Sequence, residues 1–321
     1  MAHLVHTMAY AGAEPWHGLG QSLPPRQSLD IWARAAGMDW SIEAAPVRYV
    51  AETLGNLGAI HSHPEQQVLY RSDTKEALSV VSKRYQVVQP REVLEFYRDL
   101  TEIAGYELET AGVLKGGKKF WALAKTGQSA ALKGNDQVNG YLLLATSCDG
   151  SLATTATPTT IRVVCNNTLT IAVNGATQAI KVPHNTKFDP QAVKQQLGIA
   201  VGQWDGFMYR MRTLAERKVK SHEALNFFLK VLCETTPGTL ENGLANERAL
   251  KKVQALYDGQ GRGAELESAK GTAWGLLNAV TEYVDHERRA KSPEFRLDAA
   301  WFGQGAALKQ KALDSALALA A

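Results

Sequence analysis

The stretch "YELETAGVLKGGKKFWALAKT", residues 106–126, predicts a β-hairpin. At its centre is Gly116-Gly117, and a Gly-Gly pair readily adopts the positive φ angles that a tight hairpin turn needs. A second stretch, "YLLLATSCDGSLATTAT" at residues 141–157, repeats the arrangement around an Asp-Gly pair. Two hairpins this close together in the chain predict an antiparallel β-sheet.

Strands and a covering helix are predicted ahead of the hairpins. Between residues 47 and 88 the β-rich runs "VRYVAE", "QVLYR", "LSVVS" and "YQVV" are separated by Gly, His-Pro and Asp, as strands are. The stretch "QPREVLEFYRDLTEIAG" then places Pro90 at the start of a helix and Gly105 at its end, with an apolar stripe along one side. We expect this helix to cover the sheet, and a shorter helix at residues 28–36.

The pattern becomes helical after the sheet, because Asp189 is a good helix cap and Pro190 suits the first helical position. Predicted helices are 190–219, 222–233, 245–257, 271–289 and 305–320. We therefore predict an α+β fold in which the antiparallel sheet of hairpins packs on helices. Residues 1–185 are the predicted α+β domain, and residues 186–321 are a mainly helical region.

A chemically mixed stretch, "TTIRVVCNNTLTIAVNG" at residues 159–175, is predicted to be a helix from the spacing of its apolar residues. Cys165 has no neighbouring histidine to lower its thiol pKa, so a buried, unreactive cysteine is favoured. Asn166 and Asn167 need partners if buried, which leaves both a structural and a ligand-binding use open. Arg162 can hold a carboxylate or a phosphate.

The composition of the chain says more about where the protein is located in the cell than about what it binds. The chain has 321 residues, is 45% hydrophobic and carries a formal net charge of +3, so bulk charge neither supports nor excludes a nucleic acid. Its cysteines, Cys148, Cys165 and Cys233, are odd in number and have no CxxC spacing, which disfavours disulfides and zinc. No run reaches the roughly 18 apolar residues of a membrane span. We expect a cytoplasmic protein without membrane association.

The first hairpin carries a near match to a phosphate loop, "GVLKGGKK" at residues 112–119. Its last position is a lysine instead of Ser or Thr, and a strand pattern follows where a helix is required, so an ATP site is disfavoured. A solvated turn and a hairpin that contacts phosphates both stay open. For the second, the cations are Lys115, Lys118 and Lys119, and the rings that stack on bases are Phe120 and Trp121.

Other polar stretches favour solvated surface. His61 and His63 lack a third spaced ligand for a metal. Asp285 and Arg289 lie four residues apart on a predicted helix, within reach of an ion pair. The basic cluster "RMRTLAERKVK", residues 210–220, spreads over more than one helical face, so a solvated helix end and a DNA contact both stay open.

Several stretches together resemble the phage/plasmid-like protein family, catalogued as domain-of-unknown-function family 932. They are "PWHGLG", "VSKRYQVVQP", "ETAGVLKGGKKFWALAK", "YLLLATSCDGS", "IRVVCNNTL", "AWGLLNAVTEYVDHERR" and "WFGQGAALKQKAL". The resemblance implies a protein of a mobile element that acts in the cytoplasm of a bacterial host. It implies little about biochemistry.

The architecture is also similar to single-strand annealing proteins of the phage Red-beta and eukaryotic Rad type. That similarity implies a homo-oligomer that binds single-stranded DNA along a basic groove and promotes annealing without ATP or another cofactor, and so is not an enzyme. The predicted nucleic-acid-binding residues are Lys83, Arg84, Tyr85, Lys115, Lys118, Lys119, Phe120, Trp121, Arg162, Asn166 and Asn167.

Two other functions stay open at this stage. One is a metal-dependent nuclease or hydrolase whose site forms only in the fold, which a convergent cluster of carboxylates would favour. The other is an inhibitor of host defence that binds a protein, which an exposed apolar patch would favour. A continuous basic groove would favour the annealing protein.

Overall fold

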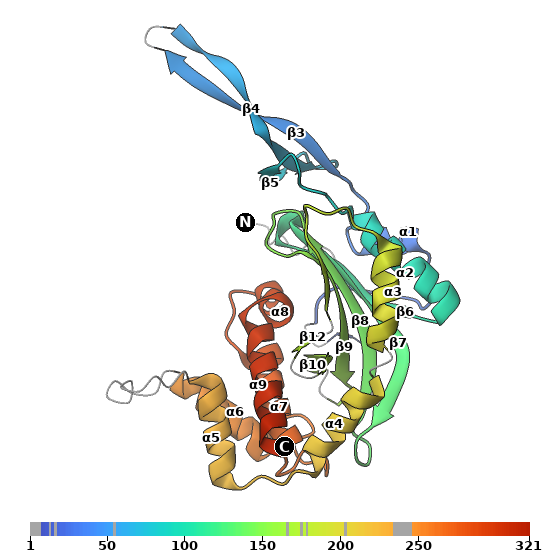
Figure 1. The fold of residues 1–321 in the computed structure, drawn as a ribbon, viewed down its shortest axis with the longest axis vertical. Helices are drawn as coiled ribbons and strands as arrows, with labels where there is room; N and C mark the ends of the chain where they lie inside the picture. Colours follow the sequence, from blue (N-terminus) through green and yellow to red (C-terminus); the bar gives the residue numbers. More distant parts are fainter. Residues whose placement is uncertain are drawn as a thin grey trace.

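A computed structural model describes residues 8–12, 14–15, 18–53, 56–164, 167–173, 176–177, 179–201, 204–233 and 246–321 of the chain. Figure 1 shows a curved β-sheet in the middle of the molecule, with helices on both faces and a long two-stranded arm that projects from one end. The fold is α+β, as the hairpin pattern predicts.

The elements follow one another in a sheet-rich part and a helix-rich part. The described strands are β1 (Met8–Ala11), β2 (Gln21–Leu23), β3 (Ile42–Thr53), β4 (Asn56–Arg71), β5 (Ala77–Ser82), β6 (Glu107–Leu114), β7 (Lys119–Ala131), β8 (Gln137–Ser147), β9 (Thr154–Arg162), β10 (Asn167–Thr170), β11 (Ala172–Val173), β12 (Ala176–Thr177) and β13 (Ile180–Val182). The described helices are α1 (Leu29–Ala35), α2 (Pro90–Ala104), α3 (Pro190–Val201), α4 (Trp204–Glu216), α5 (Ser221–Leu232), α6 (Glu247–Ala255), α7 (Ala273–Glu282), α8 (Pro293–Phe302) and α9 (Gln304–Ala320). Short helical turns are η1 (Lys115–Gly117), η3 (Leu256–Gln260) and η4 (Tyr283–Glu287).

The main sheet has eight strands within the described chain. Their order is β10-β9-β8-β7-β6-β1-β2, and β13 pairs with β9 beside β10. Its pairs are antiparallel apart from β1–β2, which is parallel. Both predicted hairpins are confirmed: β6 and β7 meet around Gly116 and Gly117, and β8 and β9 meet around the turn that contains Gly150.

Strand β7 is buried on both faces of this sheet. Phe120, Ala122 and Ala124 point to the face that α1, α2 and α3 cover, whereas Trp121 and Leu123 point to the face that α8 covers. Successive side chains of a strand alternate between faces, so a continuous apolar run such as "FWALA" marks a strand enclosed on both sides. The core of the molecule therefore lies on both sides of the central strands.

Helix α2 has the predicted boundaries. Pro90 occupies its first turn, and the Gln89 backbone N–H donates to the Glu92 carboxylate at 2.6 Å, which completes a capping box. Gly105 ends the helix in the left-handed region at φ 69°. The helix covers β6 and β7, as expected, through Val93, Phe96 and other buried side chains.

The prediction of a helix over residues 159–175 is wrong. Strand β9 continues to Arg162, and β10 returns beside it, with Asn167 opposite Arg162. Threonine, isoleucine and valine crowd this stretch, and their branched side chains favour strands over helices. Cys165 and Asn166 lie outside the described residues, so the burial of that thiol stays a prediction.

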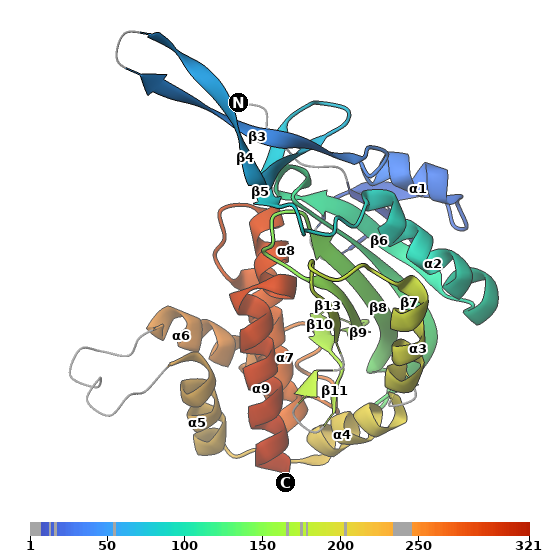
Figure 2. The ribbon, with the colours of Figure 1, turned by 45° about the horizontal axis from the view of Figure 1, so that its top comes forward.

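The projecting arm consists of β3 and β4, which pair from Ile42 opposite Arg71 out to Thr53 opposite Asn56. Strand β5 pairs only with the base of β4. Figure 2 shows that the outer part of the arm projects away from the main sheet. Tyr49, Val50 and Ile60 are exposed on this outer part, at 52%, 61% and 68%.

The base of the arm rests on the first hairpin turn. Arg71 stacks over the Trp40 ring at 4.2 Å and forms an ion pair with Asp73. Gly117, at φ 96°, lies so close that a Cβ atom there would come within 3.1 to 3.2 Å of Trp40, Arg71 and Leu78. The base of the arm therefore packs on the lysine-rich turn, which is not a freely solvated loop.

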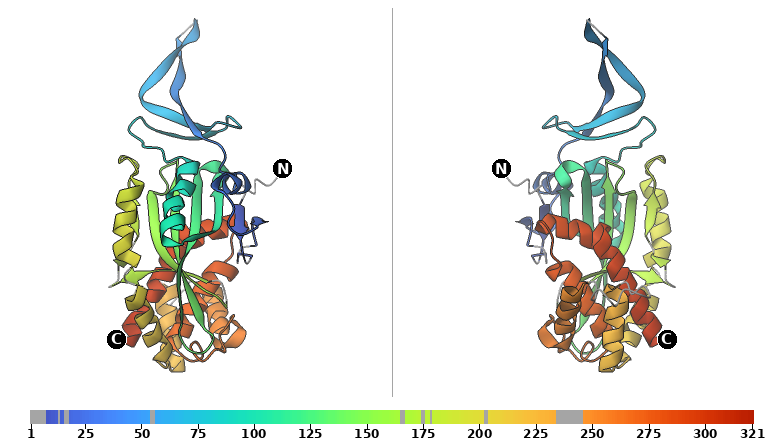
Figure 3. Two further views of the ribbon diagram at one scale, coloured as in Figure 1. Left: turned by 90° about the vertical axis from the view of Figure 1, so that its right-hand side faces the viewer. Right: turned by 90° about the vertical axis from the view of Figure 1, so that its left-hand side faces the viewer.

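The C-terminal helices cover the second face of the sheet. The predicted helices near 190, 222, 245, 271 and 305 are present, although the first divides into α3 and α4, and α8 was not predicted. Figure 3 shows the arm at one end of the molecule and α5 and α6 at the other. The division into two domains between residues 185 and 186 stays a prediction. Helices α7 and α9 of the second part pack on strand β10 of the first part. None of the described helices is long and apolar enough to cross a membrane.

Candidate nucleic-acid interface

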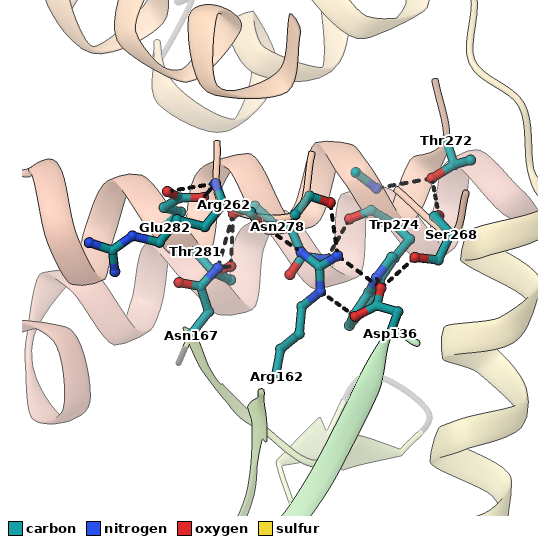
Figure 4. A network of polar contacts seen from close by, with 12 residues as sticks. Asp136, Arg162, Asn167, Arg262, Ser268, Thr272, Trp274, Asn278, Thr281 and Glu282 are labelled. Atoms are coloured by element: carbon teal, nitrogen blue, oxygen red, sulfur yellow. Dashed lines mark hydrogen bonds and ion pairs between the residues drawn. The ribbon is translucent and has the colours of Figure 1, made fainter. Parts of the chain in front are cut away.

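Asp136 and Arg162 form a buried ion pair where the sheet meets the C-terminal helices (Figure 4). The guanidinium donates to both carboxylate oxygens, with Nε–Oδ1 at 2.7 Å and Nη2–Oδ2 at 2.8 Å. Ser268 Oγ and Trp274 Nε1 donate to Oδ2 as well. Asp136 is 0% exposed. A carboxylate that accepts this many hydrogen bonds is satisfied by the protein itself. The Asp136–Arg162 pair therefore joins the sheet to the C-terminal helices and leaves no site for a ligand.

The same arginine holds the segment that leads into α7. Its Nη2 donates to the Gly263 carbonyl at 3.2 Å, and the backbone N–H of Arg262 donates to both carboxylate oxygens of Glu282 (Figure 4). Burial raises the pKa of Glu282 above its usual value, and the Arg262 N–H acts in the opposite direction. We expected Arg162 to hold a carboxylate or a phosphate, and in the structure it holds the carboxylate of Asp136.

A second buried ion pair joins β10 to η4 and α9. Lys309 Nζ donates to Asp285 Oδ1 at 2.8 Å and to Thr168 Oγ1 at 2.7 Å, and the Thr168 backbone N–H donates to Asp285 Oδ2 at 2.9 Å. Asp285 is fully buried. The expectation that Asp285 belongs to a solvated helix face is therefore wrong, because the π-helical turn η4 ends at Glu287 and the buried Asp285 carboxylate pairs with Lys309.

A third set of contacts fixes the first hairpin to α8. Asp298 accepts from Lys119 Nζ at 2.5 Å and from Lys115 Nζ at 2.7 Å. Glu294 accepts from the Lys115 backbone N–H. Lys119 is only 3% exposed, so it neutralises a carboxylate of the protein in the place where we expected a phosphate contact. The half-exposed Lys118 has no ion pair within the described chain.

The rings beside these lysines belong to the core. Phe120 and Trp121 are 0% exposed, and Trp121 packs edge-on against Trp301 with 4.7 Å between the ring centroids. Neither ring has surface with which to stack on a base. The interpretation of a stacking hairpin is corrected, because the strand is enclosed on both faces and its aromatic residues fill the two cores.

Of the two adjacent asparagines, the structure describes Asn167 but not Asn166. Asn167 is buried, and its Nδ2 donates to Thr281 Oγ1 at 3.1 Å and to the Asn278 carbonyl at 3.4 Å. Its structural use is therefore the one that the contacts favour. Asn166 lies outside the described residues, and a ligand-binding role for it stays a prediction.

An exposed basic surface forms around Tyr85, in the segment that follows β5. The Tyr85 ring stacks on His184 with 4.4 Å between centroids and 18° between planes, and both residues are half-buried. Lys83, Arg84 and Lys187 are exposed within three residues of this ring pair along the chain, and none has an ion pair among the described residues. We call these five residues the Tyr85 surface.

The Tyr85 surface adjoins the hairpin turns at the same end of the sheet. Tyr85 Oη donates to the Ser147 carbonyl at 2.9 Å, and burial raises the pKa of this phenol. Cys148, the residue directly after β8, donates its backbone N–H to the Lys118 carbonyl at 2.8 Å. The fold thus brings Lys118 to the region of Lys83 and Arg84, although it is more distant in the sequence.

The two described thiols and the described metal-ligating side chains lack what a thiol nucleophile or a metal site needs. Burial raises the pKa of Cys148 to about 12, and Cys233 is 2% exposed, so neither thiol is activated. Within the residues that the structure describes, no three His, Cys, Asp or Glu side chains gather as metal ligands.

Sequence reasoning missed helix α8 and the partners that it supplies. A signal was present: Ser292 caps the helix by accepting from the Phe295 N–H, and Pro293 follows at the first helical position. His184 had no local signal, because its stacking partner is almost a hundred residues away in the chain.

The described geometry can be compared with known proteins. The model of a family, Domain of unknown function (DUF932), matches residues 77–301. The chain belongs to the DUF932 family. The matched part runs from β5 to α8, so it includes Tyr85, His184 and the buried ion pair of Asp136, whereas β3 and β4 of the arm lie outside it. No curated protein and no solved structure matches the chain.

Proposed function

We propose that this DUF932 protein binds single-stranded DNA at the Tyr85 surface and promotes the pairing of complementary strands without ATP. The observation that carries the proposal is the stacked Tyr85–His184 pair with the unpaired cations Lys83, Arg84 and Lys187 beside it. Aromatic rings stack on bases of any sequence, and lysine and arginine bind backbone phosphates with release of counterions.

Annealing of this kind needs no covalent chemistry. The protein neutralises backbone charge and holds one strand, so that its bases can test a second strand. The resemblance to annealing proteins of the Red-beta and Rad type supports this reading, as does the resemblance to a family of mobile elements. The proposed partner is DNA, in the cytoplasm of a bacterial host.

The test is a salt titration of binding to a labelled single-stranded oligonucleotide. We expect Lys83→Ala combined with Arg84→Ala to flatten the slope of log affinity against log salt by roughly 1.4, because each phosphate contact contributes about 0.7 on a single strand. The same variant should slow pairing after a complementary strand is added. Lys230→Ala combined with Lys251→Ala removes two exposed cations of α5 and α6; it is the matched control and should leave the slope unchanged.

Two outcomes of this titration would contradict the proposal. One is the absence of binding by the unmodified protein even at low salt. The other is an equal loss of affinity in the Lys83/Arg84 variant and in the Lys230/Lys251 control, which would show that only bulk charge matters.

A second candidate function, binding of a protein partner, is favoured by the arm. Tyr49, Val50 and Ile60 expose apolar area on the outer part of the arm, which projects away from the main sheet, and exposed apolar patches mark contacts between proteins. The simplest occupant is a second copy of the chain, which is the homo-oligomer that annealing proteins require.

Self-association through the arm has its own measurement. We expect the purified protein to be an oligomer by light scattering, and Val50→Ser combined with Ile60→Ser to shift it toward the monomer, because both apolar side chains lie on one face of the ribbon. Val80→Ser, which changes an exposed valine of β5, is the control. A monomeric unmodified protein would rule this contact out.

A further inference from the structure

A small cavity lies where η4, α8 and the start of α9 meet. Its volume is about 370 Å³, and it is lined by Arg288, Arg289, Lys291, Arg296 and Phe295 together with small apolar residues. No acidic side chain lines it. The nearby acids are engaged elsewhere: Asp298 binds the lysines of the first hairpin, and Glu287 pairs with Lys252.

The four cations of this cavity lack counter-charges within the described chain. None of them forms an ion pair there, and the Arg296 Nε donates only to the Arg288 carbonyl, at 3.1 Å. Arg288 Nη2 donates to Gln304 Oε1 at 3.2 Å, but its Nη1 is buried without a hydrogen-bond partner. Arg288 lines the cavity, and no carboxylate of the described chain compensates the charge of its guanidinium.

An exposed aromatic ring forms the mouth of the cavity. Phe295 is 48% exposed, and Lys291 Nζ lies 5.9 Å from its ring centroid. Guanidinium groups present forked donors that match the oxygens of a phosphate, and a ring beside them can contact a base or a sugar. A carboxylate ligand would use the same donors. It carries less negative charge than a phosphate, however, and so matches the four cations less well.

We propose that this cavity is a phosphate-binding site, in which the guanidinium and ammonium groups of the four lining cations neutralise the phosphate. The phosphate can belong to a nucleic-acid strand or to a free nucleotide. The site is separate from the Tyr85 surface, and it stands whether or not the protein anneals DNA.

The test is calorimetric titration of the full chain with inorganic pyrophosphate, followed by competition against a labelled oligonucleotide. We expect pyrophosphate to bind, and Arg288→Met to weaken it on the order of 10-fold or more, the effect of losing a charge-assisted hydrogen bond. Lys291→Ala, an exposed change that leaves the interior intact, should weaken it several-fold. Arg212→Met on α4 is the matched control and should bind as the unmodified protein does.

The outcomes separate the phosphate sources and the two proposals. Displacement of the oligonucleotide by pyrophosphate assigns the site to a strand backbone, and binding without displacement assigns it to a free nucleotide. Both support the site. No pyrophosphate binding, or equal binding by the Arg288, Lys291 and Arg212 variants, would overturn it. Because pyrophosphate is measured without DNA, a failure of strand binding at Lys83 and Arg84 leaves this result unaffected.

Discussion

Replacing Asp136 by Asn lowers the free energy of unfolding by about 3 to 5 kcal/mol, the loss expected when one partner of a buried ion pair is removed. Asn keeps the shape of the side chain, but the Arg162 guanidinium is then left charged and only 3% exposed without its carboxylate. The donors Ser268 and Trp274 also lose a charged acceptor. Urea unfolding followed by circular dichroism measures the effect.

An exposed ion pair of the same region provides the control. Lys133 and Glu267 are 3.9 Å apart, and the Glu267 side chain is 78% exposed. Glu267→Gln is therefore expected to change the unfolding free energy by less than about 1 kcal/mol. A cost for Asp136→Asn as small as that of this control would contradict the structural role of the pair.

Replacing Lys309 by Met is expected to cost a similar amount, about 3 to 5 kcal/mol, because it leaves the fully buried Asp285 carboxylate without its cation. The methionine side chain has nearly the same length, so lost packing contributes little. Thermal and urea unfolding of the purified variant measure the loss.

A second variant distinguishes an uncompensated charge from general damage to the core. Lys309→Met combined with Asp285→Asn removes both charges and keeps a polar side chain next to the Thr168 N–H. We expect it to be more stable than Lys309→Met alone by about 1 kcal/mol or more. A double variant that is less stable than both single variants would show that charge is not the cause.

The local part of the fold was predictable from the sequence. Gly-Gly and Asp-Gly turns predict hairpins through backbone geometry alone, and Pro90 and Gly105 delimit α2 through the termini of one helix. These signals act within a few residues. They do not depend on what packs around them, which is why the antiparallel sheet could be derived without the structure.

The failed predictions depend on distant parts of the chain. Residues 159–162 are a strand because β8 and β10 flank them, and this pairing overrides an apolar spacing that also suits a helix. Phe120 and Trp121 beside lysines have the composition of a stacking surface. Only the layers on both sides of β7 show that they are core.

The candidate site could be predicted only in part, for the same reason. Lys83, Arg84 and Tyr85 were identified from composition, but His184 reaches Tyr85 only in the fold. The partner of Arg162 is Asp136, 26 residues earlier in the turn before β8, and Ser268 and Trp274 come from more than a hundred residues further on. No local spacing encodes such a group, because tertiary contacts assemble it.

Because the base of the arm rests on the first hairpin turn near Gly117, the length of the arm would multiply any tilt at that base. Strand β3 has 12 residues, so at about 3.3 Å per residue the ribbon reaches about 40 Å from its base. A tilt of about 6° at that base then displaces the tip by about 4 Å on this rise per residue. Helix α8 touches the same turn through Glu294 and Asp298. A tilt of this size between the arm and α8 would therefore move the tip by about the length of a side chain.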